Sequence, residues 1–88
     1  MIFYYTLLQS RAHAFLLERR LKIEGIECEL TYMPKAILKD LCNMGVKFKE
    51  KEFIKAVSAI NRAAIPGCRL YKEIMYPDKS EYVEVSLR

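Results

Sequence analysis

The spacing of apolar residues changes several times along this chain, and each change marks a predicted element. Residues 2–8 are aromatic or aliphatic at nearly every position, which predicts a buried central strand. Residues 27–33 alternate between polar and apolar side chains, so a strand with one buried face is expected there. Shorter apolar runs predict three more strands, at residues 44–48, 68–76 and 81–87.

Two segments repeat apolar residues every three or four positions and are predicted to be helices, from Ser10 to about Glu24 and from about Glu50 to Ala63. Ser10 is the expected N-cap of the first helix, and Gly25 stands where a left-handed C-terminal cap belongs. The apolar positions that we expect to face the core in these helices are Ala14, Leu17, Leu21, Phe15, Leu16 and Ile23, then Phe53, Val57, Ile60, Ala64 and Ile54.

The elements follow the order βαββαβ with one more strand at the end, which predicts an α+β fold of the ferredoxin-like split βαβ type. Residues 1–88 are expected to form one domain with a C-terminal hairpin over residues 68–88, and residues 35–43 a loop with one helical turn. In this topology the loop lies beside the start of the first helix and the turn before the fourth strand. The residues expected to gather at that edge are Gln9, Ser10, Arg11, His13, Cys42, Pro66, Gly67 and Cys68.

Composition and charge narrow the functional class. The chain has 88 residues, 52% of them hydrophobic, as expected for one small globular domain. Its net charge is +4, but Lys and Arg are mixed with Glu, so a nucleic-acid partner is not expected. No apolar run approaches the ~18 residues of a membrane-spanning helix, and the N-terminus lacks the features of a signal peptide. We therefore expect no membrane contact.

The cysteine pattern argues against two common uses of cysteine. Three cysteines at wide spacing, with a single histidine, do not form a disulfide framework or a metal site. This usage favours a reducing cytoplasm. Cys28 falls on the apolar face of a predicted strand and is expected in the core.

Cys42 is the best candidate for a reactive group, because it lies in a break between two strand-like runs and three lysines flank it. A thiol reacts as its thiolate, which nearby positive charge stabilises. The alternative interpretation is a small apolar residue buried under a loop. The residues expected to surround Cys42 in a binding site are Lys35, Lys39, Asn43, Lys47, Ser10 and Arg11. Cys68 could act as a resolving thiol or fill space, and His13 could act as a base or lie on the surface.

The order of elements and the Cys42 segment resemble the selenium/sulfur carrier-like family of small bacterial proteins. The resemblance covers roughly Tyr4 to Ile60. It includes the strand before Ser10, the helix end at Glu24-Gly25-Ile26, Pro34 before the loop, Cys42, and the strand from Met44 to Phe48. Family members typically carry small residues and then Cys-Gly, whereas this chain has Asp40-Leu41 before the cysteine and Asn43 after it.

The resemblance implies a thiol-based carrier or adaptor in sulfur or selenium handling. Cys42 would hold the chalcogen, and partner proteins would donate and accept it, without a bound cofactor. We do not expect an enzyme. A different class of function stays open, namely a non-catalytic regulatory or interaction module of ferredoxin-like fold that binds a metabolite or a partner protein.

The last predicted strand has one apolar face, formed by Val83, Val85 and Leu87. This face must be covered. We expect that the hairpin either completes the helix-covered core or packs against a second subunit, and we favour a homodimer because a short chain gains core by pairing.

Overall fold

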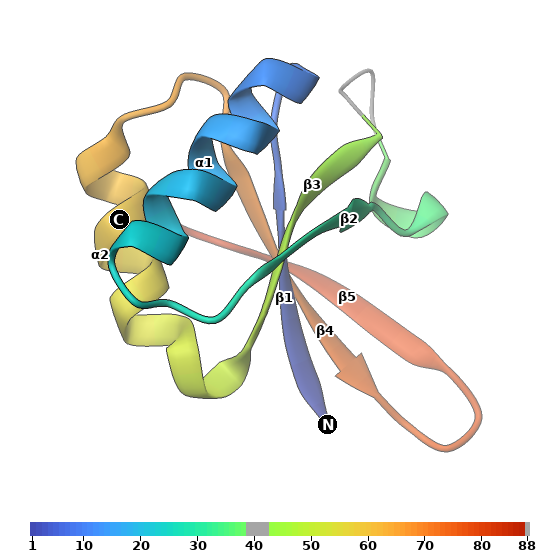
Figure 1. Cartoon of the computed structure of the whole chain (residues 1–88). Coiled ribbons are helices and arrows are strands. Elements are labelled where there is room, and N and C mark those ends of the chain that lie inside the picture. The colour runs from blue at the N-terminus through green and yellow to red at the C-terminus, as the bar shows by residue number, and fades with distance from the viewer. Residues whose placement is uncertain (39–42, 88) are drawn as a thin grey trace.

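The computed structural model describes residues 1–38 and 43–87, which fold as an α+β domain (Figure 1). Five antiparallel strands form one sheet in the order β2-β3-β1-β4-β5, and two α-helices pack on it. The elements are β1 (Ile2–Leu7), α1 (Arg11–Ile23), β2 (Glu29–Tyr32), the 3-10 helix η1 (Lys35–Ile37), β3 (Met44–Lys49), the 3-10 helix η2 (Glu50–Glu52), α2 (Phe53–Ala63), β4 (Arg69–Met75) and β5 (Ser80–Val85). Within the described residues, no helix is long and apolar enough to cross a membrane.

The predicted order of strands and helices is confirmed, and the differences lie at element ends. Ser10 is the N-cap of α1, where its hydroxyl accepts a hydrogen bond from the backbone N–H of His13 at 3.2 Å. Gly25 follows α1 with a φ of 76°, a left-handed conformation that glycine adopts without strain. The second predicted helix begins instead as the 3-10 turn η2 and becomes α-helical at Phe53.

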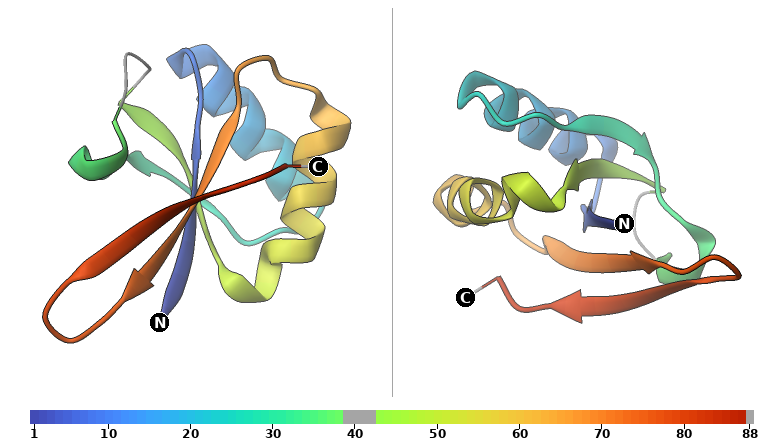
Figure 2. Two further views of the ribbon diagram at one scale, coloured as in Figure 1. Left: turned by 180° about the vertical axis from the view of Figure 1, so that it is seen from behind. Right: turned by 90° about the horizontal axis from the view of Figure 1, so that it is seen from below.

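Both helices cover the same face of the sheet (Figure 2). Ala14, Leu17 and Leu21 of α1 are fully buried there, and α2 contributes Ala56, Ala59 and Ile60. At the centre, the ring of Tyr4 stacks on Phe48 with centroids 5.4 Å apart and contacts Phe53 at 4.7 Å. Aromatic rings from β1, β3 and the start of α2 thus join α2 to the sheet.

The prediction that Phe15, Leu16, Ile23 and Ile54 widen this core is wrong. Their exposed fractions are 53%, 55%, 73% and 83%. A helix lying on a sheet buries one face, and in α1 the stripe of Ala14, Leu17 and Leu21 already occupies it. Apolar residues on the opposite face cannot reach the sheet.

The second face of the sheet is covered in part by residues 33–38, which follow β2 and include η1 (Figure 2). Met33 and Ile37 from this segment are buried against Tyr5, Leu7 and Tyr71. The close approach depends on Gly45. A Cβ at this position would lie 2.2 Å from the carbonyl oxygen of Thr6 and 2.8 Å from Sδ of Met33.

The C-terminal hairpin contributes to both faces of the sheet. Val85 and Leu87 pack against the helix-side core, and Tyr82 packs against the second-face cluster. Val83 is 52% exposed. Much of the apolar face of β5 is therefore covered within the chain, and the homodimer stays a prediction.

Substituting Gly45→Ala is expected to destabilise the fold severely. The new methyl group meets a backbone carbonyl that cannot move away, so we expect a loss of at least about 3 kcal/mol in the free energy of unfolding. Urea denaturation followed by circular dichroism measures it. Gly25→Ala is the matched control: nothing lies within 4 Å of its Cβ, so only the positive φ is strained, at about 1 kcal/mol. Equal losses in the two variants would contradict the packing of Met33 on Gly45.

Candidate functional site

One edge of the domain collects the start of α1 and the starts of β3 and β4 (Figure 1). Leu7, the last residue of β1, is opposite Gly45 of β3 and Arg69 of β4. The chain that follows β1 therefore runs between the segments that precede β3 and β4. We call this the loop edge, and it comprises residues 8–10, 43 and 66–68.

The segment before α1 and the turn before β4, which are predicted to lie together, meet at the loop edge. The side chain of Gln9 lies directly over Gly67, where an added Cβ would be 2.2 Å from Nε2 of Gln9. Gly67 has a φ of 73°, a left-handed conformation that favours glycine. The topology thus predicts correctly that the helix start and the Pro66-Gly67 turn lie together.

The predicted residues at the entry to β3 divide into two groups. Cys42 and Lys39 lie outside the described residues. Asn43 is exposed at the loop edge, and its carbonyl oxygen accepts a hydrogen bond of 2.8 Å from the backbone N–H of Met33. Lys35 is exposed on η1.

Lys47 points away from the loop edge. It faces Tyr5 across the sheet, and its ammonium lies 4.2 Å from the centre of the Phe3 ring and 5.6 Å from that of Tyr5. Phe3 is further from the loop edge than Tyr5, because β1 ends at Leu7. The positive charge of Lys47 is thus directed at aromatic faces on the second face of the sheet.

Three predicted residues belong to the first turn of α1. Ser10 is occupied as the N-cap, and Arg11 is exposed. His13 is half-buried, and its Nδ1 has no hydrogen-bond partner within the described residues. The free N–H groups at this helix start favour a negative charge nearby, which a thiolate would supply.

The two described cysteines are poor nucleophiles. Burial raises the pKa of Cys28, whose Sγ donates to the carbonyl oxygen of Glu18 at 3.9 Å. Burial raises the pKa of Cys68 to about 12, since its side chain packs against the helix-side core. At neutral pH both groups are thiols, and a thiol reacts far more slowly than a thiolate.

Sequence analysis missed a polar cluster on the second face of the sheet. Glu73 is 6% exposed, and its carboxylate accepts hydrogen bonds of 2.9 Å from the hydroxyls of Tyr5 and Tyr82. Burial raises the pKa of Glu73, but hydrogen bonds from Ser80 and the two tyrosines outweigh it and bring the pKa below its usual value. A carboxylate at an inward position of an alternating strand was the signal that could have found this cluster.

Comparisons with known proteins identify the family. The chain belongs to the family described as "Putative Se/S carrier protein-like", whose model matches residues 3–72. No curated protein and no solved structure matches the chain. Within residues 1–38 and 43–87, no group of three or more His, Cys, Asp or Glu side chains could hold a metal ion.

Alkylation should distinguish the cysteines by pH. In a Cys42→Ser variant, the reaction of Cys68 with iodoacetamide should stay very slow at pH 8 and accelerate only in strongly alkaline solution. Its pKa lies about three units above the ordinary 9.0, so the thiolate fraction is roughly a thousandfold lower than that of a free thiol. Peptide mapping by mass spectrometry measures each site. A rate for Cys68 at pH 8 equal to that of free cysteine would contradict its burial.

The Glu73 cluster should make stability depend on pH. Its folded-state pKa is lower than the ordinary 4.5, so the carboxylate stabilises the fold above that pH, and this stabilisation is lost as the pH falls through the folded-state value. Glu73→Gln should remove this dependence and lower the free energy of unfolding at pH 7 by about 1–3 kcal/mol, because an amide cannot accept both tyrosine hydroxyls equally well. Thermal melts between pH 3 and pH 7, roughly the range in which carboxyl groups titrate, measure it. The exposed Glu81→Gln is the control, and an unchanged pH dependence in Glu73→Gln would refute the assignment.

Proposed function

We propose that this chain is a thiol-based carrier in sulfur or selenium handling and that Cys42 carries the chalcogen. The observation that carries the proposal is membership of the Se/S carrier-like family over residues 3–72, a range that includes Cys42. A carrier of this kind needs one accessible thiolate and partner proteins that load and unload it.

The state of the other cysteines supports the choice of Cys42. Burial raises the pKa of both Cys28 and Cys68, so neither provides a thiolate at neutral pH. The chain has three cysteines, and Cys42 is the remaining one. Asn43, which follows Cys42, lies at the loop edge, and near this edge the exposed Arg11 and the N–H groups of the first turn of α1 would favour a negative charge. Lys35, Lys39, Asn43 and Ser10 complete the proposed surroundings.

The transfer step needs no external oxidant. The Cys42 thiolate attacks the terminal sulfur of a persulfide on a donor protein, so a new S–S bond forms at Cys42 while the S–S bond of the donor breaks. The donor cysteine leaves as a thiolate, and the transferred sulfur keeps its oxidation state. Cys42 then carries a persulfide, or a selenylsulfide when selenium is transferred, and passes it on by the reverse exchange.

We also propose that the fold is a ferredoxin-like variant with one added strand. The order of elements supports it, as do the neighbours β2-β3-β1-β4 within the sheet and the two helices on one face. Strand β5 then continues this sheet beyond β4.

Mass spectrometry tests the carrier function. After incubation with a cysteine desulfurase and cysteine, the native chain should gain the mass of one sulfur atom, and a reductant should remove it. Cys42→Ser should gain none, whereas Cys28→Ser and Cys68→Ser should be loaded as the native chain is. Equal loading of Cys42→Ser and the native chain would rule the proposal out. An inert Cys42 combined with a specific ligand-induced melting shift would favour the regulatory module instead.

A further inference from the structure

Helix α1 carries apolar side chains on two opposite faces. The inner face is buried on the sheet through Ala14, Leu17 and Leu21. On the outer face, Phe15, Leu16 and Ile23 are 53%, 55% and 73% exposed. With Ala12 and Arg19, they follow the three- and four-residue spacing of one helix face. A helix whose second face is also apolar offers a surface of the kind that other proteins bind.

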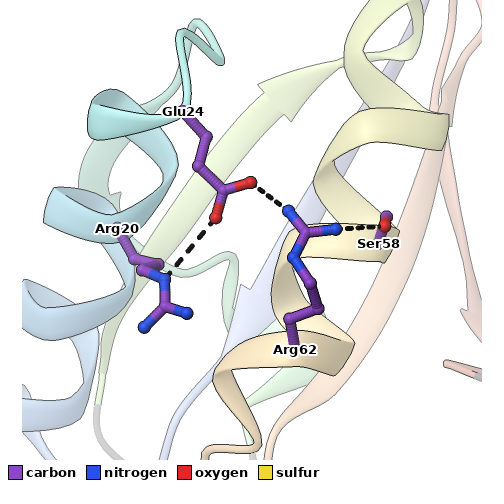
Figure 3. A network of polar contacts seen from close by, with 4 residues as sticks. All are labelled: Arg20, Glu24, Ser58 and Arg62. Carbon is purple, nitrogen blue, oxygen red and sulfur yellow. Dashed lines mark hydrogen bonds and ion pairs between the residues drawn. The ribbon is translucent and has the colours of Figure 1, made fainter.

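Most of the charges around this outer stripe are positive. Arg11, Arg19 and Lys22 lie on the same side of α1 as Phe15. The two carboxylates of this segment are already paired: Glu18 with Lys22 at 3.2 Å, and Glu24 with Arg20 at 3.5 Å and with Arg62 of α2. Figure 3 shows Glu24 held between Arg20 and Arg62, with Arg62 also donating to Ser58. Within the described residues Arg19 has no ion pair, so the stripe presents an uncompensated positive charge.

We propose that the outer face of α1 is the docking surface for the sulfur-donating enzyme, which binds it through an apolar groove rimmed by acidic residues. The inference rests on the carrier function proposed above. Phe15, Leu16 and Ile23 enter the groove in the helix-in-groove mode, and Arg19 pairs with a carboxylate of the enzyme. Because α1 begins at the loop edge, an enzyme bound along it is held beside the segments that flank Cys42.

The position of Arg19 favours this occupant over two others. Arg19 lies within the stripe between Phe15 and Ile23 and not at its border. In a membrane this guanidinium would enter the acyl region, whereas surface helices keep their charges on the polar side. In a symmetric pair of α1 helices that buries the whole stripe, the two-fold axis passes near its middle, where Arg19 comes close to its own copy, and like charges repel. A protein groove can place a carboxylate at this point.

Loading the chain from two different sulfur donors distinguishes an effect on enzyme docking from an effect on the reactivity of Cys42. The native chain, Arg19→Glu and the double variant Phe15→Ser with Leu16→Ser are loaded either by a cysteine desulfurase with cysteine or by glutathione persulfide, and mass spectrometry follows the rates. Ile54→Ser, which removes a still more exposed apolar side chain from α2, is the matched control. Circular dichroism checks that each variant is folded, which we expect because all the changed side chains are exposed.

We expect both α1 variants to be loaded by the enzyme at least about tenfold more slowly than the native chain, and Ile54→Ser at the native rate. Loading by glutathione persulfide should be unchanged in all of them, and added salt should slow only the enzymatic reaction. Native-rate enzymatic loading of both α1 variants would overturn the docking surface but leave the carrier function standing. If glutathione persulfide loads the native chain but the desulfurase with cysteine does not, the desulfurase is not the partner. No loading by either donor would instead refute the carrier function.

Two measurements test the other occupants of the stripe. Sedimentation should give the same oligomeric state for the native chain and for Arg19→Glu. Flotation with phosphatidylglycerol vesicles should recover the native chain and the double variant Phe15→Ser with Leu16→Ser to the same extent. A dimer or a vesicle complex that depends on the stripe would overturn the proposal and assign the surface to a second copy or to a membrane.

Discussion

The bare backbone of Gly45 is the constraint on which the two-sided architecture depends. The carbonyl of Thr6 and the sulfur of Met33 approach this position more closely than any Cβ would allow. Met33 can therefore turn the chain after β2 onto the second face of the sheet, and Ile37 follows it to cover Leu7 and Tyr71. Without this contact, residues 33–38 would lose the packing that holds them against the second face of the sheet.

The sheet consequently has two interiors of different character. The helix-side interior is built mainly from aliphatic and aromatic side chains and includes the stacked rings of Tyr4 and Phe48. The second interior is smaller and contains the carboxylate of Glu73 with its tyrosine donors. An apolar interior tolerates changes that conserve volume, whereas a polar one depends on every partner being present. The two faces of one sheet thus depend on different kinds of interaction.

Local patterns predict much of this fold, and their failures have physical causes. Ser10 and Gly25 act through neighbouring backbone, so both ends of α1 are predicted well. The alternation of residues 27–33 predicts a strand there, but β2 is shorter, Glu29–Tyr32, and Tyr32 is exposed. Phe15, Leu16 and Ile54 have the same helical spacing as core residues, and hydrophobicity alone cannot tell which face meets the sheet. At the candidate site, the sequence predicts a reactive thiol at Cys42 only from the spacing of the cysteines and the lysines that flank it. The inward position of Glu73 in its strand marks it as unusual, but its bond to Tyr5 joins residues 68 positions apart, so the sequence does not name that partner.

In helix α1, the side chains that stabilise the fold and the apolar side chains that are exposed lie on opposite faces. Its inner stripe contributes to the stability of the domain through complete burial, whereas its outer stripe makes no contact with the sheet. Substitutions on the outer side therefore alter the surface of the domain with little effect on whether it folds. A scaffold arranged in this way can acquire a new specificity through a few exposed positions of a single helix, while its interior stays as it is.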